Sequence, residues 1–314
     1  MNAVLDDLNK KYVARTPQML DTGMRVTALE PGRGTMVMPA RADWVGDPGR
    51  QVLHPGVLTV LADSACGLAV GAALPQRVPY ATLDLRMDYL CPAGPGHDIH
   101  CEAHCYRLTR SVAFVRADVW QAERDQPIAT AQATFMLSTP AGSPRPRPGA
   151  DGATQAPVSA APPAPESGHW QPPDASEPVL PEQPIPYVEY LGIRAAPGQP
   201  VPLFRLPYQP KLIGNPYLPA LHGGVVAGFA ETAALLHLAQ ALKGAKLPKG
   251  IDFAVDYLRA GRPVETFAQC ELVRVGARVA LVQVRCWQSS PDYPIVVARG
   301  HFLLAATEGE AATG

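Results

Sequence analysis

The sequence has little net charge, few aromatic residues and few cysteines. Its 27 lysine and arginine residues nearly balance 28 aspartate and glutamate residues, which leaves a formal net charge of −1. Because this balance gives no electrostatic attraction for nucleic acid or for an anionic membrane, we expect neither as a partner. The N-terminal residues also lack an apolar run of signal-peptide length. These absences favour a cytoplasmic protein.

Cysteine spacing does not indicate a disulfide framework. No CxxC motif occurs, and four of the six cysteines lie in the first half without a counterpart at the same place in the second. Free thiols are typical of a reducing compartment. The six positions are Cys66, Cys91, Cys101, Cys105, Cys270 and Cys286.

A cluster of histidine and cysteine that begins at His97 has the composition of a metal site. Side chains alternate across a strand, so Cys101 and Cys105 would face away from His100. His104 shares the face of His100, and the aligned part of the second half repeats none of these residues. We therefore expect no metal and no cofactor.

Two long apolar stretches, residues 53–74 and residues 221–242, dominate what is present. Each predicts a helix that is apolar nearly all round, and such a helix belongs inside a protein. We expect neither to span a membrane, because both are short and contain glycines and an acidic residue. That acidic residue is Asp63 in the first helix and Glu231 in the second. Burying a carboxylate is costly, so each needs an explanation.

The two stretches are copies of one another. A shift of 168 residues superposes His54 on His222 and Asp63 on Glu231. The match runs without a gap over the 37 residues 54–90, of which twelve are identical to their counterparts. It includes a following segment that ends in Asp-Tyr-Leu in both halves. The chain therefore contains a duplication of one domain rather than a short-period repeat.

Each copy has the pattern of an antiparallel sheet built beside its helix, because apolar and polar residues alternate after the helix ends. Residues 1–140 are predicted to form the first domain and residues 183–308 the second. Residues 141–182, rich in proline and alanine, offer too few large apolar residues for a core and predict a linker. The predicted strands cover residues 80–90, 98–108, 111–121 and 128–138, and then residues 250–258, 266–275, 277–287 and 295–304.

The segments LHGGVVAGFAE and LHPGVLTVLAD, with the later GIDFAVDYL and TLDLRMDYL, resemble the hot-dog fold acyl-CoA thioesterases of the phenylacetate-pathway (PaaI-like) branch. The resemblance covers both halves. It implies an α+β fold, here a tandem or double hot-dog, in which an antiparallel sheet wraps round each long helix. It also implies a small-molecule acyl-CoA substrate and an active site between two paired copies. Whether tandem chains pair further into a homodimer stays open.

The resemblance assigns one side of a composite site to the second half. Gly223, at the start of a helix, would donate its backbone N–H to a thioester carbonyl. Gly224 and His222 would complete this helix start, with the histidine organising the turn rather than transferring protons. Asn215 lies in the loop before the helix and would also contribute, although it stands one residue further from the motif than in some relatives.

The other side of this site would come from the first half. Asp63 would act either as a general base toward water or as a nucleophile, and the sequence leaves both roles open. Thr82, two residues before the recurring Asp84, would hold the attacking water. We predict that these residues form the one working site of the chain.

A second possible site is equivalent to the first, with the roles of the two halves exchanged. It combines His54 and Gly56 of the first half with Glu231 of the second. Pro55 stands where the oxyanion donor should be, and proline has no N–H. Gly250 replaces the hydroxyl residue. Losing one oxyanion donor typically costs about 2.7–4 kcal/mol of transition-state stabilisation, so we predict that this second site is degenerate.

Two other functions stay open from the sequence. One is a module that binds an acyl-CoA without cleaving it. The other is a hot-dog hydratase acting on an enoyl-CoA. Such hydratases usually carry an Asp-x4-His arrangement, and no histidine lies five residues after Asp63 or Glu231, which disfavours that reading.

Overall fold

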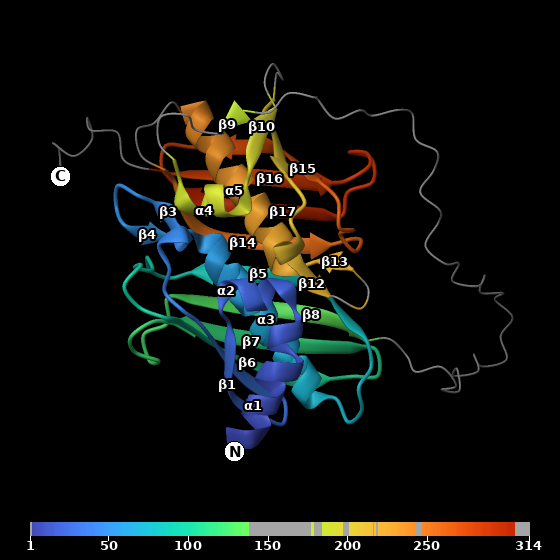
Figure 1. The fold of residues 1–314 in the computed structure, drawn as a ribbon. Helices are drawn as coiled ribbons and strands as arrows, with labels where there is room; N and C mark the ends of the chain where they lie inside the picture. Colours follow the sequence, from blue (N-terminus) through green and yellow to red (C-terminus); the bar gives the residue numbers. More distant parts are fainter. Residues whose placement is uncertain are drawn as a thin grey trace, which may run out of the picture.

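The computed structural model describes residues 2–137, 177–178, 184–196, 201–215, 217, 219–242 and 247–304. Within them, one continuous sheet of 13 strands carries two long helices, α3 (Pro55–Ala73) and α5 (Gly223–Leu242). Figure 1 shows the two halves side by side along this sheet, the first in blue and green and the second in yellow to red. Each half contributes one long helix, as the duplication requires.

The first half contains two short helices, the long helix and eight strands. The strands after α3 follow the predicted ones to within two residues at each end. In chain order the elements are α1 (Asn2–Lys11), α2 (Pro17–Thr22), β1 (Arg25–Glu30), β2 (Arg33–Met38), β3 (Val45–Asp47), β4 (Val52–Leu53), α3, β5 (Tyr80–Tyr89), β6 (Ile99–Leu108), β7 (Val112–Trp120) and β8 (Ala129–Leu137).

The second half repeats this order. Most of the predicted linker, residues 141–182, lies outside the described residues, but Glu177 and Pro178 form an edge strand that the sequence did not predict. In chain order the elements are β9 (Glu177–Pro178), α4 (Pro186–Leu191), β10 (Arg194–Ala196), β11 (Leu203–Leu206), β12 (Ile213–Asn215), β13 (Ala220–Leu221), α5, β14 (Lys249–Tyr257), β15 (Thr266–Val275), β16 (Val279–Trp287) and β17 (Val296–Leu303).

The halves join through β5 and β14, which pair antiparallel at the centre of the sheet. The register places Arg86 opposite Ala254, and these two positions are related by the 168-residue shift. The join is therefore a local two-fold axis. Arg86 forms an ion pair of 2.6 Å with Asp88 on its own strand and one of 3.3 Å with Asp252 across the join. The ion pair with Asp252 helps to hold the two central strands together.

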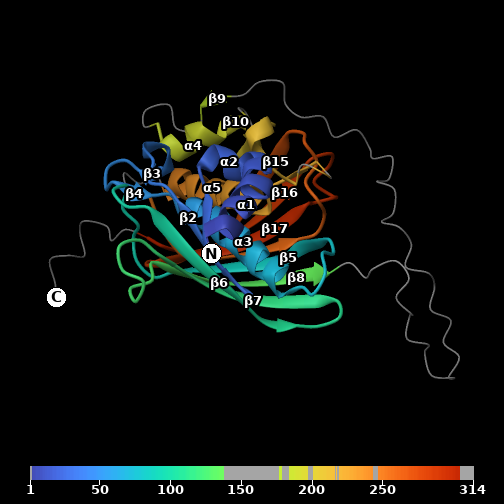
Figure 2. The same cartoon turned by 60° about the horizontal axis from the view of Figure 1, so that its bottom comes forward.

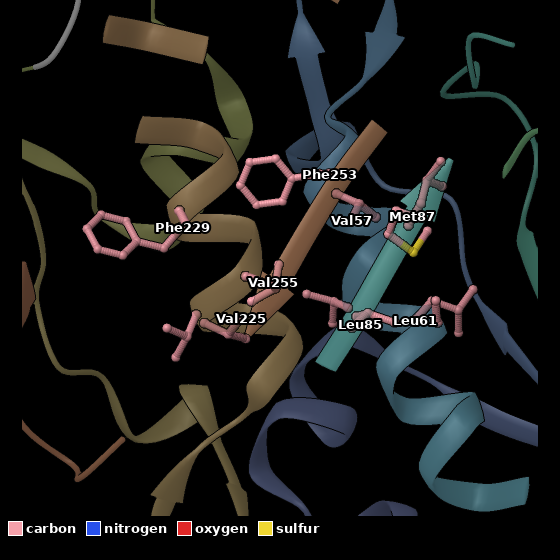
Figure 3. Packing of buried hydrophobic residues seen from close by; sticks show 14 of the residues in the cluster. Val57, Leu61, Leu85, Met87, Val225, Phe229, Phe253 and Val255 are labelled. Carbon is pink, nitrogen blue, oxygen red and sulfur yellow. The ribbon is translucent and has the colours of Figure 1, made fainter. Parts of the chain in front are cut away.

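The core lies between this sheet and the two long helices. Leu85 and Met87 of β5 and their counterparts Phe253 and Val255 of β14 are buried against the helices (Figure 3). Figure 2 shows α3 and α5 on one face of the curved sheet, with α2 and α4 on their outer side. Together these observations confirm the tandem hot-dog architecture.

Burial explains the apolar character of both helices. By length and composition each is able to cross a membrane, so the prediction that they are too short was wrong. However, 83% of the most apolar window in each helix is buried inside the protein. Their hydropathy therefore reflects a place in the core.

The helices cross closely near their first turns. A Cβ atom on Gly224 would lie 2.7 Å from the Cα of Val60, and one on Gly56 would lie 2.9 Å from the Cα of Gly228. The local two-fold axis relates the two contacts, because residues 56 and 60 shift onto residues 224 and 228. Glycine is required at this crossing because a side chain would push the helices apart. The crossing brings the start of α5 to the carboxylate of Asp63 in α3.

Candidate functional site

Asp63 of α3 lies against the start of α5. Its Oδ2 atom accepts a hydrogen bond of 2.7 Å from the backbone N–H of Gly224. A Cβ atom on Gly223 would lie 2.9 Å from the same oxygen, so only glycine leaves room for the carboxylate there. The first helical turn carries unpaired N–H groups and the positive end of the helix dipole, both of which favour an anion. The acid from one half and the helix start from the other thus meet.

Thr82 of β5 supplies the second hydrogen bond to this carboxylate. Its hydroxyl donates to Oδ1 of Asp63 at 3.0 Å. Each carboxylate oxygen is therefore held by one donor, and the side chain is 7% exposed. A carboxylate fixed in this way, with a small opening to solvent, is suited to act on a bound water or on a carbonyl carbon.

Gly223 and Asn215 are the remaining residues of the predicted first site, and their hydrogen bonding differs. The N–H of Gly223, the first residue of α5, has no hydrogen-bond partner among the described residues and is available to an acceptor. Asn215 of β12 is exposed, and its Oδ1 accepts from the N–H of Tyr217 at 3.0 Å. None of the hydrogen bonds described above links Asn215 to Asp63, so its role stays a prediction.

Comparison with known proteins identifies the family. Two segments, residues 50–128 and residues 218–295, match the family model of the Thioesterase superfamily, and together they span half of the chain. Each match contains one long helix and the three strands that follow it. The chain belongs to the Thioesterase superfamily. The fold and enzyme class that the sequence resemblance implied, a hot-dog thioester hydrolase, are confirmed.

Individual relatives agree with this assignment. The medium/long-chain acyl-CoA thioesterase YigI of Escherichia coli is 27% identical over 143 residues, which is 41% of this chain and 91% of that protein. A protein of Novosphingobium aromaticivorans provisionally named a thioesterase shares the fold with a TM-score of 0.62 at 17% identity, over 90% of this chain and 98% of that one. A hot-dog protein of unknown function from Alicyclobacillus acidocaldarius gives 0.57 at 14% identity, over 90% and 96%.

The histidines at both helix starts of this thioesterase organise the turn. Nδ1 of His222 accepts from the N–H of Gly224 at 3.1 Å, and Nε2 lies 3.0 Å from the hydroxyl of Ser64. His54 makes the same pair of contacts with Gly56 and Thr232. An accepting Nδ1 belongs to a neutral ring, and burial lowers the pKa of His222 and that of His54, the latter to about 3.

The second site of the thioesterase, which contains Glu231, has different chemistry. Oε2 of Glu231 accepts a hydrogen bond of 2.9 Å from the hydroxyl of Tyr89, and Oε1 has no partner among the described residues. Pro55 begins α3, so no N–H corresponds to that of Gly223. Gly250, the counterpart of Thr82, carries no hydroxyl. The acid here is held by a phenol, with a further hydrogen-bond contribution from Thr59, and not by the N–H of a helix start.

The burial of Glu231 also affects its protonation. Glu231 is fully buried, and burial raises its pKa to about 8, against a smaller opposing effect of the Tyr89 hydrogen bond. Near neutral pH this carboxyl is therefore mostly protonated. A protonated acid does not accept a proton from water. Asp63 differs in its surroundings, because a backbone N–H at a helix start donates to its carboxylate.

Tyr257 is a site residue that sequence reasoning missed. Its ring lies within 3.5 Å of a Cβ atom placed on Gly223, and its hydroxyl is buried without a hydrogen-bond partner among the described residues. Burial, and then the nearby Asp63, raise its pKa well above the usual value for tyrosine, so the phenol keeps its proton. The Asp-Tyr-Leu segment repeated in both halves was the available signal.

The cluster that begins at His97 lies away from this site, on β6 and the loop before it. Cys101 and Cys105 point into the core, whereas His100 and His104 are partly exposed. The predicted alternation of the two residue types across the strand is confirmed. His100 stacks on Trp120 of the neighbouring strand β7.

Proposed function

We propose that the chain hydrolyses an acyl-CoA thioester at one composite site, formed by Asp63 of the first half and the start of α5 in the second half. The observation that carries this proposal is the contact of Asp63 with the helix start, where Gly224 donates to the carboxylate at 2.7 Å. Membership of the Thioesterase superfamily and the similarity to an acyl-CoA thioesterase support the reaction class.

The thioester carbonyl would bind at the N-terminus of α5. In the proposed complex, the N–H of Gly223 donates to the carbonyl oxygen, and the helix dipole stabilises the negative charge that develops there. The buried hydroxyl of Tyr257, which lacks a partner, lies beside Gly223 and would be a second donor. One such donor typically contributes about 2.7–4 kcal/mol to transition-state stabilisation.

Asp63 would then deliver the nucleophile. As a general base it removes a proton from water while the water oxygen attacks the carbonyl carbon. The carbon–sulfur bond breaks, the thiolate of coenzyme A takes the proton, and the carboxylic acid leaves. As a nucleophile, the carboxylate would first attack the carbonyl carbon, which breaks the carbon–sulfur bond, releases the thiolate of coenzyme A and leaves an acyl anhydride on Asp63. Water would then cleave the anhydride, which frees the carboxylic acid and restores the carboxylate, and the thiolate would take the remaining proton. Thr82 fixes the carboxylate in either case. The proposed reaction requires no metal or redox cofactor.

Thiol release from acyl-CoA substrates tests this proposal. Purified protein should release free coenzyme A from at least one member of a panel of short, medium, long and aromatic acyl-CoAs. The similarity to YigI makes medium and long chains the first choice. If no substrate yields thiol above the uncatalysed rate while S-alkyl-CoA thioethers still bind, the chain is a binding module and the proposal is wrong.

Trapping an intermediate separates the two roles of Asp63. A nucleophilic mechanism accumulates an acyl-enzyme anhydride that hydroxylamine captures, whereas a general-base mechanism does not. Mass spectrometry of the peptide that contains Asp63, after single turnover with hydroxylamine, distinguishes them. The matched Asp63→Asn variant controls for labelling elsewhere.

A further inference from the structure

A cavity of about 380 Å³ lies beside the second site, which contains Glu231. It is bounded by the start of α3, the end of β5, the start of β14 and one turn of α5. Its volume falls in the range of pockets that bind small organic ligands. The lining is mainly apolar, as expected for a cavity that holds a hydrocarbon chain, and includes Leu53, Leu58, Leu235, Pro248, Ile251 and Leu303.

A tyrosine stands at the corresponding position of the first half. Pro248 and Leu235 shift by 168 residues onto Tyr80 and Gly67. The ring of Tyr80 lies along α3 there, and its hydroxyl donates to the carbonyl oxygen of Gly67 at 2.9 Å. A Cβ atom on Gly71 would lie 3.1 Å from the same hydroxyl. The two halves therefore differ here, because a smaller proline lines the cavity where the first half has the tyrosine.

Charged side chains stand at the opening of the cavity. Arg50 and Lys249 both line it, and Lys249 is exposed. Asp47 also lines it and pairs with Arg50 at 3.3 Å. Two cations against one carboxylate leave a net positive charge at the opening. Arg50 is further held by the carbonyl oxygen of Leu247 at 3.3 Å, so its position is fixed. Such an opening attracts an anionic group on an apolar ligand.

The wall of the cavity lacks the groups that hydrolysis needs. Pro55 provides no N–H to polarise a carbonyl, although it lines the cavity. Gly250 also lines it, and a Cβ atom there would lie 3.6 Å from the unpartnered Oε1 of Glu231. Glu231 therefore sits directly behind the wall as a buried acid that is mostly protonated near neutral pH, and a protonated acid does not activate water.

We infer that this cavity is a second ligand site, which binds an acyl chain bearing an anionic group and does not hydrolyse it. Both a free fatty acid and an acyl-CoA have this chemistry. The inference rests on the proposed function only for the expectation that acyl chains reach the protein. The cavity, the cationic opening and the missing oxyanion donor stand independently of the reaction at Asp63.

Cys91 gives a direct readout of occupancy. It lines the cavity and is the one exposed cysteine of the six, since the other five are buried. Labelling by a maleimide, followed by mass spectrometry, therefore reports on the cavity. The probes are dodecanoate below its micelle concentration and S-dodecyl-CoA, a thioether that cannot be hydrolysed. We expect bound probe to slow labelling of Cys91 roughly tenfold, with half-protection at the dissociation constant.

Variants separate this cavity from the first site. Leu235→Trp fills the cavity and should abolish protection, while Lys249→Glu, at an exposed position, should raise the half-protecting concentration roughly tenfold. Lys10→Glu on α1 makes the same charge change outside the cavity and should have no effect. Both cavity variants should keep the wild-type rate of thiol release.

The outcomes of this experiment are distinct. Protection by dodecanoate alone identifies a free acid as the ligand, and protection by the thioether alone identifies an acyl-CoA. Absence of protection by either probe overturns the inference, as does protection that survives in both cavity variants. Protection without any thiol release from the acyl-CoA panel would refute the proposed hydrolysis and leave the second site intact.

Discussion

Replacing Glu231 by glutamine should remove a large part of the pH dependence of stability. Burial raises the pKa of Glu231 from 4.5 to about 8. Because the folded state binds this proton more tightly than the unfolded state, the free energy of unfolding falls as pH rises from about 4.5 to about 8 and changes little above that. At about 1.4 kcal/mol per pH unit, the full effect is on the order of 5 kcal/mol.

Urea denaturation at pH 5, 7 and 9 measures this effect. The wild type should lose several kcal/mol of unfolding free energy over the range, whereas Glu231→Gln should lose much less and should be the more stable protein at pH 9. Glutamine has the shape of the protonated acid, and its carbonyl oxygen still accepts from Tyr89. The control is Glu271→Gln, at an exposed position on β15. Parallel curves for the wild type and Glu231→Gln would refute the claim that this acid is neutral.

Three other predictions concern the first site. Thr82→Ala removes the hydrogen bond to Asp63 and should lower kcat roughly tenfold, while Thr82→Ser should restore it. Tyr257→Phe should lower kcat without lowering the unfolding free energy, because the hydroxyl it deletes is buried without a partner; equal losses in both would contradict this. Gly224→Ala should lower the unfolding free energy by about 1–3 kcal/mol, since its Cβ would lie 2.7 Å from Val60, whereas Gly96→Ala, with open space around it, should not.

The sequence predicted the fold because the duplication doubled every signal. The long helix, the strand that follows it and the sequence motif recur at a fixed shift. The structural interpretation of each half therefore supports that of the other. The family resemblance also predicted a composite site between the two halves. The hydrogen bond between Asp63 and Gly224 supports that proposal.

The features that the sequence did not predict depend on three-dimensional packing between distant segments. The Tyr89 hydroxyl reaches Glu231 across the join of the two halves, 142 residues away in the chain. The cavity beside the second site is lined by residues from α3, β5, α5 and β14, which are distant in the sequence, so the sequence alone did not reveal it. The edge strand at Glu177 is too short to show any alternation.

The central claim is that catalysis uses the acid of the first half and not that of the second. The most direct test compares kcat for Asp63→Asn and Glu231→Gln on the same acyl-CoA, with folding confirmed for both. Asp63→Asn should reduce turnover roughly 10²- to 10⁴-fold, the usual contribution of a positioned base, and Glu231→Gln should retain most of it. Full activity in Asp63→Asn, or loss of activity in Glu231→Gln alone, would contradict the assignment.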